Sequence, residues 1–194
     1  MATTTSSTFL AAANSQVARH TPVWFMRQAG RSLPEYRAIR GEGSILDAIK
    51  QPDLAAEITL QPVRRYVVDA AVLYSDIVVH AHAVGFGIDV TPGTGPVAPD
   101  PLRSRADLAR LRPLEPDDIG YVAATVARVR AELGPDVPVL AFAGAPFTVA
   151  SYLIEGGPSR TYEHTQALLH TDASLWHEVM DRHRRQAVHH LVPE

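Results

Sequence analysis

Three short apolar runs, separated by long stretches with helical patterns, constrain the fold of this chain more than any other feature. The runs cover residues 22–26, 70–79 and 137–142, and each is long enough for a strand buried on both faces. About 40 to 60 residues lie between successive runs, which is room for helices and insertions. The order strand, helix, strand, helix, strand therefore predicts an α/β protein.

The segments around these runs carry helix signals and one irregular excursion. Residues 85–101 contain four glycines and four prolines, which predicts an irregular segment that could include a hairpin. Pro62 predicts a kink in one of the longer helices, and Gly134 predicts the end of another. We expect helices at 9–18, 35–40, 44–50, 52–67, 106–111, 117–133, 147–155, 160–170 and 173–188.

Two arginines follow the first run and flank a glycine. Arg27 and Arg31 cannot lose their charge inside a protein, so at the end of a buried strand they need anionic partners. Those anions could be acids of the fold or a bound ligand, and Gly30 would let the backbone come close to either. The alternative is a pair of surface arginines on either side of a turn.

The second and third runs also lead into polar residues. Asp76 interrupts the second run, where an unpaired acid is costly, so it is either a salt-bridge partner or a functional carboxylate. Tyr152 lies on the helix expected after the third run, where a tyrosine is either core or ligand-binding. Polar residues at the carboxyl ends of strands suit both an open doubly wound sheet and a barrel.

Composition excludes several classes of protein. The chain has 194 residues, a formal net charge of −3, and 17 arginines with a single lysine spread along it, which argues against nucleic-acid binding. The absence of cysteine excludes disulfides and thiolate metal sites and fits a reducing cytoplasm. No apolar run approaches the roughly 20 residues of a membrane span. Residues 1–8 lack a basic start, so we expect a flexible arm there rather than a secretory signal.

Three segments resemble signatures of the uroporphyrinogen decarboxylase family. They are Pro-Val-Trp-Phe-Met-Arg-Gln-Ala-Gly-Arg at 22–31, Leu-Tyr-Ser-Asp-Ile-Val at 73–78, and Phe-Ala-Gly-Ala-Pro-Phe-Thr-Val-Ala-Ser-Tyr-Leu-Ile-Glu-Gly-Gly at 142–157. The resemblance implies a (β/α)8 TIM barrel. Such a barrel takes roughly 250 residues, so residues 9–194 would form an incomplete domain with about the first three βα units. We expect the likeness to run from Phe9 to Met180 and to stop near Arg182.

The resemblance also implies an activity, namely decarboxylation of the acetate side chains of uroporphyrinogen III to give coproporphyrinogen III, with no cofactor and no metal. A pyrrole ring protonated at carbon would be the electron sink, and a carboxylate would stabilise that cation. A porphyrinogen substrate, a cytoplasmic location and a homodimer are implied as well, without membrane or nucleic-acid partners. The implied catalytic residues are Asp76, Arg27 and Arg31, and the implied substrate-binding residues are Arg27, Gln28, Ala29, Gly30, Arg31, Asp76 and Tyr152.

Three alternatives stand beside this reading. His80 and His82 are two residues apart just after the second run, a spacing that barrel hydrolases use to bind a metal. Methyltransferases that depend on cobalamin or zinc share the fold that the resemblance implies. A truncated, non-catalytic fragment is the third alternative, because three of eight strands would leave two unpaired sheet edges that favour aggregation or association.

Overall fold

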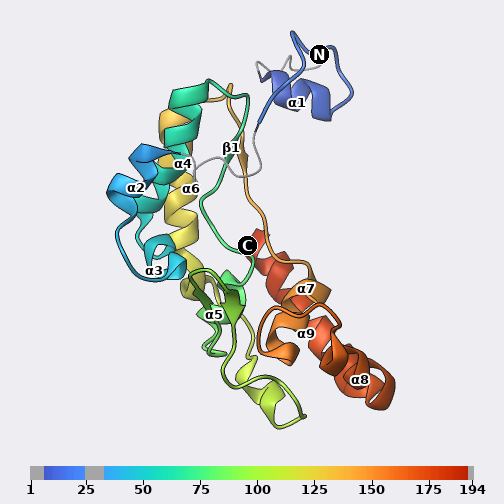
Figure 1. The fold of residues 1–194 in the computed structure, drawn as a ribbon. Helices are drawn as coiled ribbons and strands as arrows, with labels where there is room; N and C mark the ends of the chain where they lie inside the picture. Colours follow the sequence, from blue (N-terminus) through green and yellow to red (C-terminus); the bar gives the residue numbers. More distant parts are fainter. Residues whose placement is uncertain (1–6, 25–32, 192–194) are drawn as a thin grey trace. The chain divides into compact units, whose positions relative to one another are not determined.

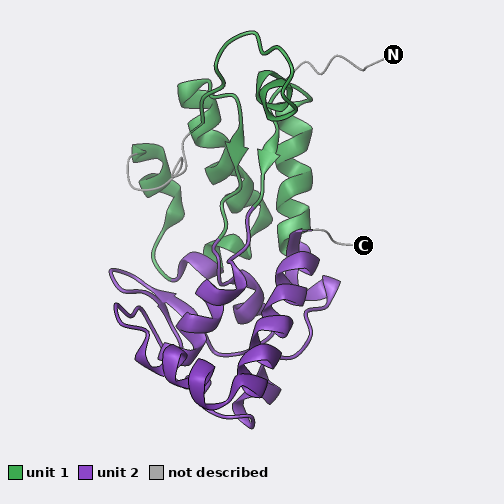
Figure 2. Ribbon diagram, turned by 90° about the vertical axis from the view of Figure 1, so that its right-hand side faces the viewer, with its two compact units in different colours: residues 1–43, 47–75, 121–141 green, residues 44–46, 76–120, 142–194 purple. Residues whose placement is uncertain are grey.

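The computed structural model describes residues 7–24 and 33–191, and these form two compact units. Unit 1 is built from residues 1–43, 47–75 and 121–141, and unit 2 from 44–46, 76–120 and 142–194 (Figure 2). The chain passes from unit 1 to unit 2 shortly after each of two parallel strands, so unit 2 contains the segments that follow the strands. Helices precede, separate and follow two short parallel strands, which confirms the predicted α/β class (Figure 1).

Unit 1 packs helices against a two-stranded parallel sheet. Strand β1 (Ala71–Val72) pairs with β4 (Val139–Leu140). A buried cluster joins Ala56 and Leu60 to Val129, which places two of the helices side by side. These two are α4 (Pro52–Tyr66) and α6 (Gly120–Leu133), and the unit also contains α1 (Thr8–Ala13) and α2 (Pro34–Arg40).

Proline and glycine set the ends of these helices as the sequence predicts. Pro34 and Pro52 occupy the first turns of α2 and α4, where a missing N–H costs nothing. Gly41, just after α2, has φ +66°, and Gly134, just after α6, also has φ +66°. Such backbone angles favour glycine, so both helices end where glycine allows the chain to turn.

Unit 2 is mainly helical. Its helices α7 (Pro146–Glu155), α8 (Glu163–Thr171) and α9 (Ala173–Leu191) pack on one another, and α5 (Val79–Ala83) contacts α9. An antiparallel hairpin of β2 (Asp89–Thr91) and β3 (Gly95–Val97) confirms the hairpin anticipated within the glycine- and proline-rich excursion. Unit 2 also contains the short helices η1 (Asp107–Arg110) and η2 (Pro116–Ile119). The residues of α3 (Ile45–Ile49) are divided between the two units.

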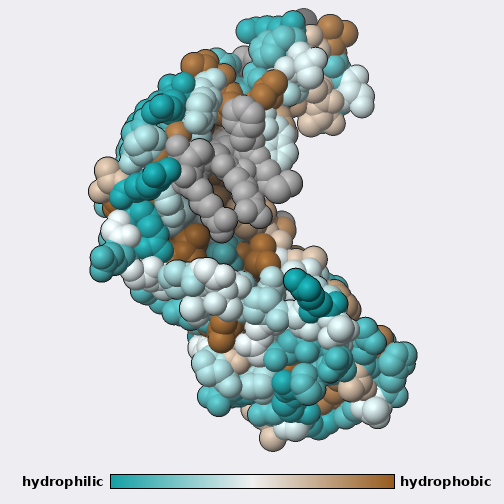
Figure 3. All heavy atoms as spheres, viewed as in Figure 1, coloured by the Kyte–Doolittle hydropathy of each residue, from teal (hydrophilic) through white to brown (hydrophobic). Residues whose placement is uncertain are grey.

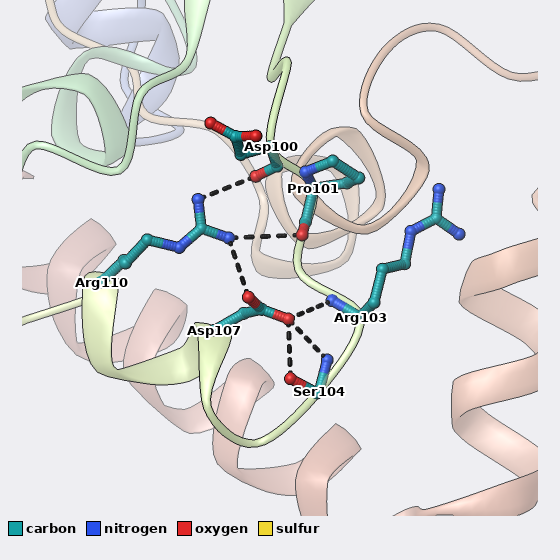
Figure 4. A network of polar contacts seen from close by, with 6 residues as sticks. All are labelled: Asp100, Pro101, Arg103, Ser104, Asp107 and Arg110. Carbon is teal, nitrogen blue, oxygen red and sulfur yellow. Dashed lines mark hydrogen bonds and ion pairs between the residues drawn. The ribbon is translucent and has the colours of Figure 1, made fainter.

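Polar contacts fix the loop before η1 in unit 2 (Figure 4). The Asp107 carboxylate accepts hydrogen bonds from the Ser104 backbone N–H at 2.9 Å, the Ser104 hydroxyl at 2.8 Å and the Arg103 N–H at 3.1 Å. Arg110 donates to the carbonyl oxygens of residues 100 and 101 at 2.9 and 3.3 Å, and its guanidinium lies 4.5 Å from the centroid of the Phe86 ring. These contacts hold the segment in one conformation although it has little regular structure.

The predicted strands are shorter in the structure, and the prediction for 70–79 is wrong beyond Val72. Asp76 competes with the sheet, because its carboxylate accepts the N–H of Val78 at 3.1 Å and turns the chain into α5. The third run forms a strand only at Val139 and Leu140. In the first run, residues 22–24 form no strand and residues 25–26 lie outside the described residues.

The N-terminal helix is also shorter than predicted. Helix α1 ends at Ala13, and Ser15, with φ +56°, turns the chain away from the expected continuation to residue 18. Ser7 accepts a hydrogen bond from the N–H of Leu10 at 3.3 Å and caps the helix. Residues 1–6 of the predicted flexible arm lie outside the described residues.

Hydrophilic residues dominate the visible face of α8 and α9, at the lower right of Figure 3. Among residues 7–24 and 33–191, no helix combines the length and the apolar character that crossing a bilayer requires.

Candidate active site

Asp76 lies in unit 2, in the turn between β1 and α5. Its side chain is partly buried, and burial is the largest effect on its pKa, which it raises above the usual range for aspartate. Hydrogen bonds from the backbone N–H groups of Val78 and Ile77 act in the opposite direction and favour the ionised form. The backbone N–H groups therefore bind the carboxylate, while its buried environment disfavours the ionised form.

Gly144 brings the segment after β4 against the Asp76 turn. A Cβ atom at position 144 would lie 2.6 Å from the carbonyl oxygen of Ile77 and 2.3 Å from Cγ2 of Val149, distances at which a side chain cannot fit. Only glycine allows this approach. This close approach packs Ile77, the residue after Asp76, near the first turns of α7, the helix that carries Tyr152.

Tyr152 lines a small cavity in unit 2 at the end of α7. The side chain is partly buried, and among the described residues no protein group bonds to its hydroxyl. The cavity has a volume of about 140 Å³ and is rich in hydroxyl groups. Its lining consists of Phe147, Thr148, Ser151, Tyr152, Gly157, Pro158, Ser159 and Tyr162.

Five of the seven predicted substrate-binding residues cannot be placed. Arg27, Gln28, Ala29, Gly30 and Arg31 lie outside the described residues. That these five residues lie close to Asp76 and Tyr152 stays a prediction. The structure thus places two of the seven, both in unit 2.

The histidines proposed as a metal pair do not project to one side. The prediction assumed an extended backbone, but His80 and His82 lie on α5, where residues two apart point in different directions. His80 is 1% exposed, whereas His82 bonds through Nδ1 to the carbonyl oxygen of Ile88 at 2.7 Å. No group of three or more potential metal-binding side chains occurs within the described part of the chain.

The sequence reasoning missed a buried histidine cluster between α5 and α9. The ring of His80 lies 5.9 Å from that of His183 and 6.4 Å from that of His190, measured between centroids. All three rings are at most 7% exposed, and each has at least one buried nitrogen without a hydrogen-bond partner. Burial, as the largest cause, lowers the pKa of His80 to about 4 and that of His183 to about 3. The helical spacing of His183 and His190, seven residues apart on one face, was the available signal.

Comparison with known proteins shows the family. Residues 4–192 match the profile described as Uroporphyrinogen decarboxylase (URO-D), so the chain belongs to this family. The match corrects our expectation that the likeness would stop near Arg182, since α9 is included to its end.

Curated relatives support the same assignment. The chain is 55% identical to a uroporphyrinogen decarboxylase of Streptomyces griseus, over 92% of this chain and 49% of the relative. It is 56% identical to that of Streptomyces coelicolor, over 92% and 50%, and 55% identical to that of Thermobifida fusca, over 91% and 48%. The chain therefore spans about half the length of the curated relatives it matches.

The fold also resembles that of a solved structure. A methyltransferase from Methanosarcina mazei superposes with a TM-score of 0.65, covering 92% of this chain and 52% of the other, at 20% sequence identity. At that identity the likeness concerns the fold alone.

Proposed function

We propose that this chain supplies the amino-terminal part of the catalytic site of a uroporphyrinogen decarboxylase, a carboxy-lyase that converts uroporphyrinogen III to coproporphyrinogen III. The observation that carries the proposal is the family match over residues 4–192, together with an aspartate held by backbone N–H groups at the end of a parallel strand. We also propose that the chain forms about the first three βα units of a (β/α)8 barrel, that the complete protein is a homodimer and that it acts in the cytoplasm.

Asp76 is the proposed catalytic carboxylate. Protonation of a pyrrole ring at carbon creates a cation, and an ionised acid beside the ring stabilises it without reorganising during the reaction. Burial raises the pKa of Asp76, whereas the backbone hydrogen bonds to its carboxylate favour the ionised form, and a cationic substrate intermediate would favour that form further. The pyrrole itself acts as the electron sink, so the proposed reaction needs no metal or organic cofactor.

Arg27 and Arg31 are proposed to bind carboxylates of the substrate, with Gln28, Ala29 and Gly30 shaping the segment between them. A guanidinium matches a carboxylate with two parallel hydrogen bonds but is a poor acid, so we assign the arginines to binding and orientation. The free hydroxyl of Tyr152 is proposed to donate a hydrogen bond to the substrate.

The test is turnover of uroporphyrinogen by the purified chain, followed by fluorescence of the oxidised products. We expect Asp76→Asn to lower kcat by about 100-fold or more, because the carboxylate acts on the charge of the transition state. Asp136→Asn is the matched control, since Asp136 is exposed and forms no ion pair with any residue that the structure describes, and we expect it to keep full activity.

Two outcomes would contradict the proposal. Equal rates for the Asp76→Asn variant and the unchanged chain would exclude the assigned carboxylate. A chain that shows cooperative unfolding but no turnover would favour the alternative of a non-catalytic fragment, which the half-length match to its relatives makes the main rival.

A further inference from the structure

A large cavity lies in unit 2 between the segment at residues 112–114 and helix α9. Its volume is about 770 Å³, within the range of pockets that bind small molecules. The predicted catalytic residues do not line it. The lining consists of Arg112, Pro113, Leu114, Ser174, His177, Glu178, Asp181, Arg182, Arg185, Gln186 and His189.

Arg182 is the cation in this cavity that lacks an acidic partner. Its Nη1 donates to the carbonyl oxygens of Leu108 and Leu111 at 2.8 and 3.0 Å, which pins the side chain against the loop. Among the described residues no carboxylate lies within salt-bridge distance of it. The rest of the guanidinium is thus left to bind an anion.

The other charges of the cavity are already paired. Arg112 bonds to the carboxylate of Asp118 at 2.6 and 2.7 Å, and Arg185 to that of Asp181 at 2.8 Å. Glu178 forms a salt bridge of 2.7 Å with Arg105, which does not line the cavity. One uncompensated positive charge remains, so the cavity suits a single negative charge rather than a polyanion.

Two polar side chains that line the same cavity as Arg182 each have a buried polar atom without a hydrogen-bond partner. Gln186 is 2% exposed, and its Nε2 donates to the carbonyl oxygen of Arg112 at 2.8 Å, whereas its Oε1 is buried without a partner. His189 likewise has a buried Nε2 without a partner. An unpaired buried polar atom costs about 1–3 kcal/mol, so a ligand donor would stabilise this arrangement.

We propose that this cavity binds a small monocarboxylate with an apolar body and one N–H or O–H donor. The carboxylate bonds to Arg182, the donor bonds to Oε1 of Gln186, and the apolar body packs against Pro113 and Leu114. The loop contacts drawn in Figure 4 fix the segment that leads into η1, and Leu108 of η1 is one of the two residues that anchor Arg182. The carboxylate anchor, Arg182, is therefore held in place before the ligand arrives, which lowers the entropic cost of binding.

Three related probes separate the two polar contacts. Indole-3-acetate has both the carboxylate and the N–H, indole-3-acetamide lacks the charge, and 1-methylindole-3-acetate lacks the donor. We expect indole-3-acetate to bind with a Kd near 1 mM, a value typical of ligands of this size. The acetamide should bind about tenfold or more weakly, and the methylated acid several-fold more weakly, in titrations followed by NMR.

Variants of α9 test the location. Arg182→Gln should reduce the affinity for indole-3-acetate to that for the acetamide, while Arg182→Lys should keep part of the preference for the acid. Arg184→Gln is the matched control, because Arg184 lies on the same helix, pairs with Asp181 at 2.8 Å and does not line the cavity.

The proposal is overturned by either of two results with the unchanged chain. One is the absence of saturable binding of indole-3-acetate up to about 10 mM, well above the expected Kd. The other is equal affinity for the acid and the acetamide. Both results are obtained without a substitution, so they do not depend on whether the Arg182 variants fold.

Discussion

Replacing His183 should make the protein more tolerant of acid. This ring is fully buried on α9 beside His80, and both of its nitrogens lack hydrogen-bond partners. Burial, as the largest cause, and the neighbouring His80 lower the pKa of His183 from the ordinary value of 6.5 to about 3, against a smaller opposing effect of the Gln186 side chain. The folded state therefore accepts the neutral ring, whereas the unfolded chain takes up a proton as the pH falls below 6.5.

The magnitude follows from the two pKa values. Between pH 7 and pH 5 the unfolded state gains a proton at His183 and the folded state does not, which costs about 2 kcal/mol of stability. His183→Leu, of similar volume, should remove that loss. At pH 7 the variant should also be more stable by about 1–3 kcal/mol, because two unsatisfied nitrogens are replaced by apolar groups.

Urea unfolding followed by circular dichroism at pH 5, 6 and 7 measures these differences. The control is His170→Gln on the exposed surface of α8, which should follow the pH dependence of the unchanged protein. The reasoning is refuted if His183→Leu loses as much stability between pH 7 and pH 5 as the unchanged protein. An NMR titration that finds the His183 pKa near 6.5 would refute it as well.

Two further substitutions test the packing on which the site depends. Gly144→Ala should destabilise the protein by about 3 kcal/mol or more, because the new Cβ would lie 2.6 Å from the Ile77 carbonyl oxygen, while Gly120→Ala, with no atom within 4 Å, should stay within about 1 kcal/mol in thermal unfolding. Thr59→Val should cost about 1–3 kcal/mol in urea unfolding, since the Thr59 hydroxyl accepts the buried N–H of Tyr74 at 2.9 Å. A loss of less than about 0.5 kcal/mol would contradict the close Gly144–Ile77 approach in the case of Gly144→Ala, and the Thr59–Tyr74 hydrogen bond in the case of Thr59→Val.

The helices were largely predictable because their signals are local. Proline in the first turn and glycine after the last residue set the bounds of α2, and Gly134 closes α6 as predicted. The strands were predicted as too long. Apolar character says only that a segment is buried, and at Asp76 a local hydrogen bond to Val78 ends the extended backbone where hydrophobicity alone would continue it.

The candidate site was predictable in part. Asp76 and Tyr152 were proposed because their segments resemble family signatures, and their roles stay predictions. The structure places both residues in unit 2, while the five residues at 27–31 lie outside the described part of the chain. The cavity along α9 could not be found in this way. Its unpaired atoms belong to Arg182 and Gln186, which look like surface residues of a helix in sequence.

The sequence by itself determined the family, the α/β class and the positions of most helices, since these depend on the residues of short motifs and on neighbours a few positions apart. Only the tertiary structure decided that His183 would be buried against His80, that Gly144 would touch the Asp76 turn, and that Arg182 would lack an acid. Burial, pKa and pairing depend on groups distant in sequence, and the chain brings those groups together only when it folds.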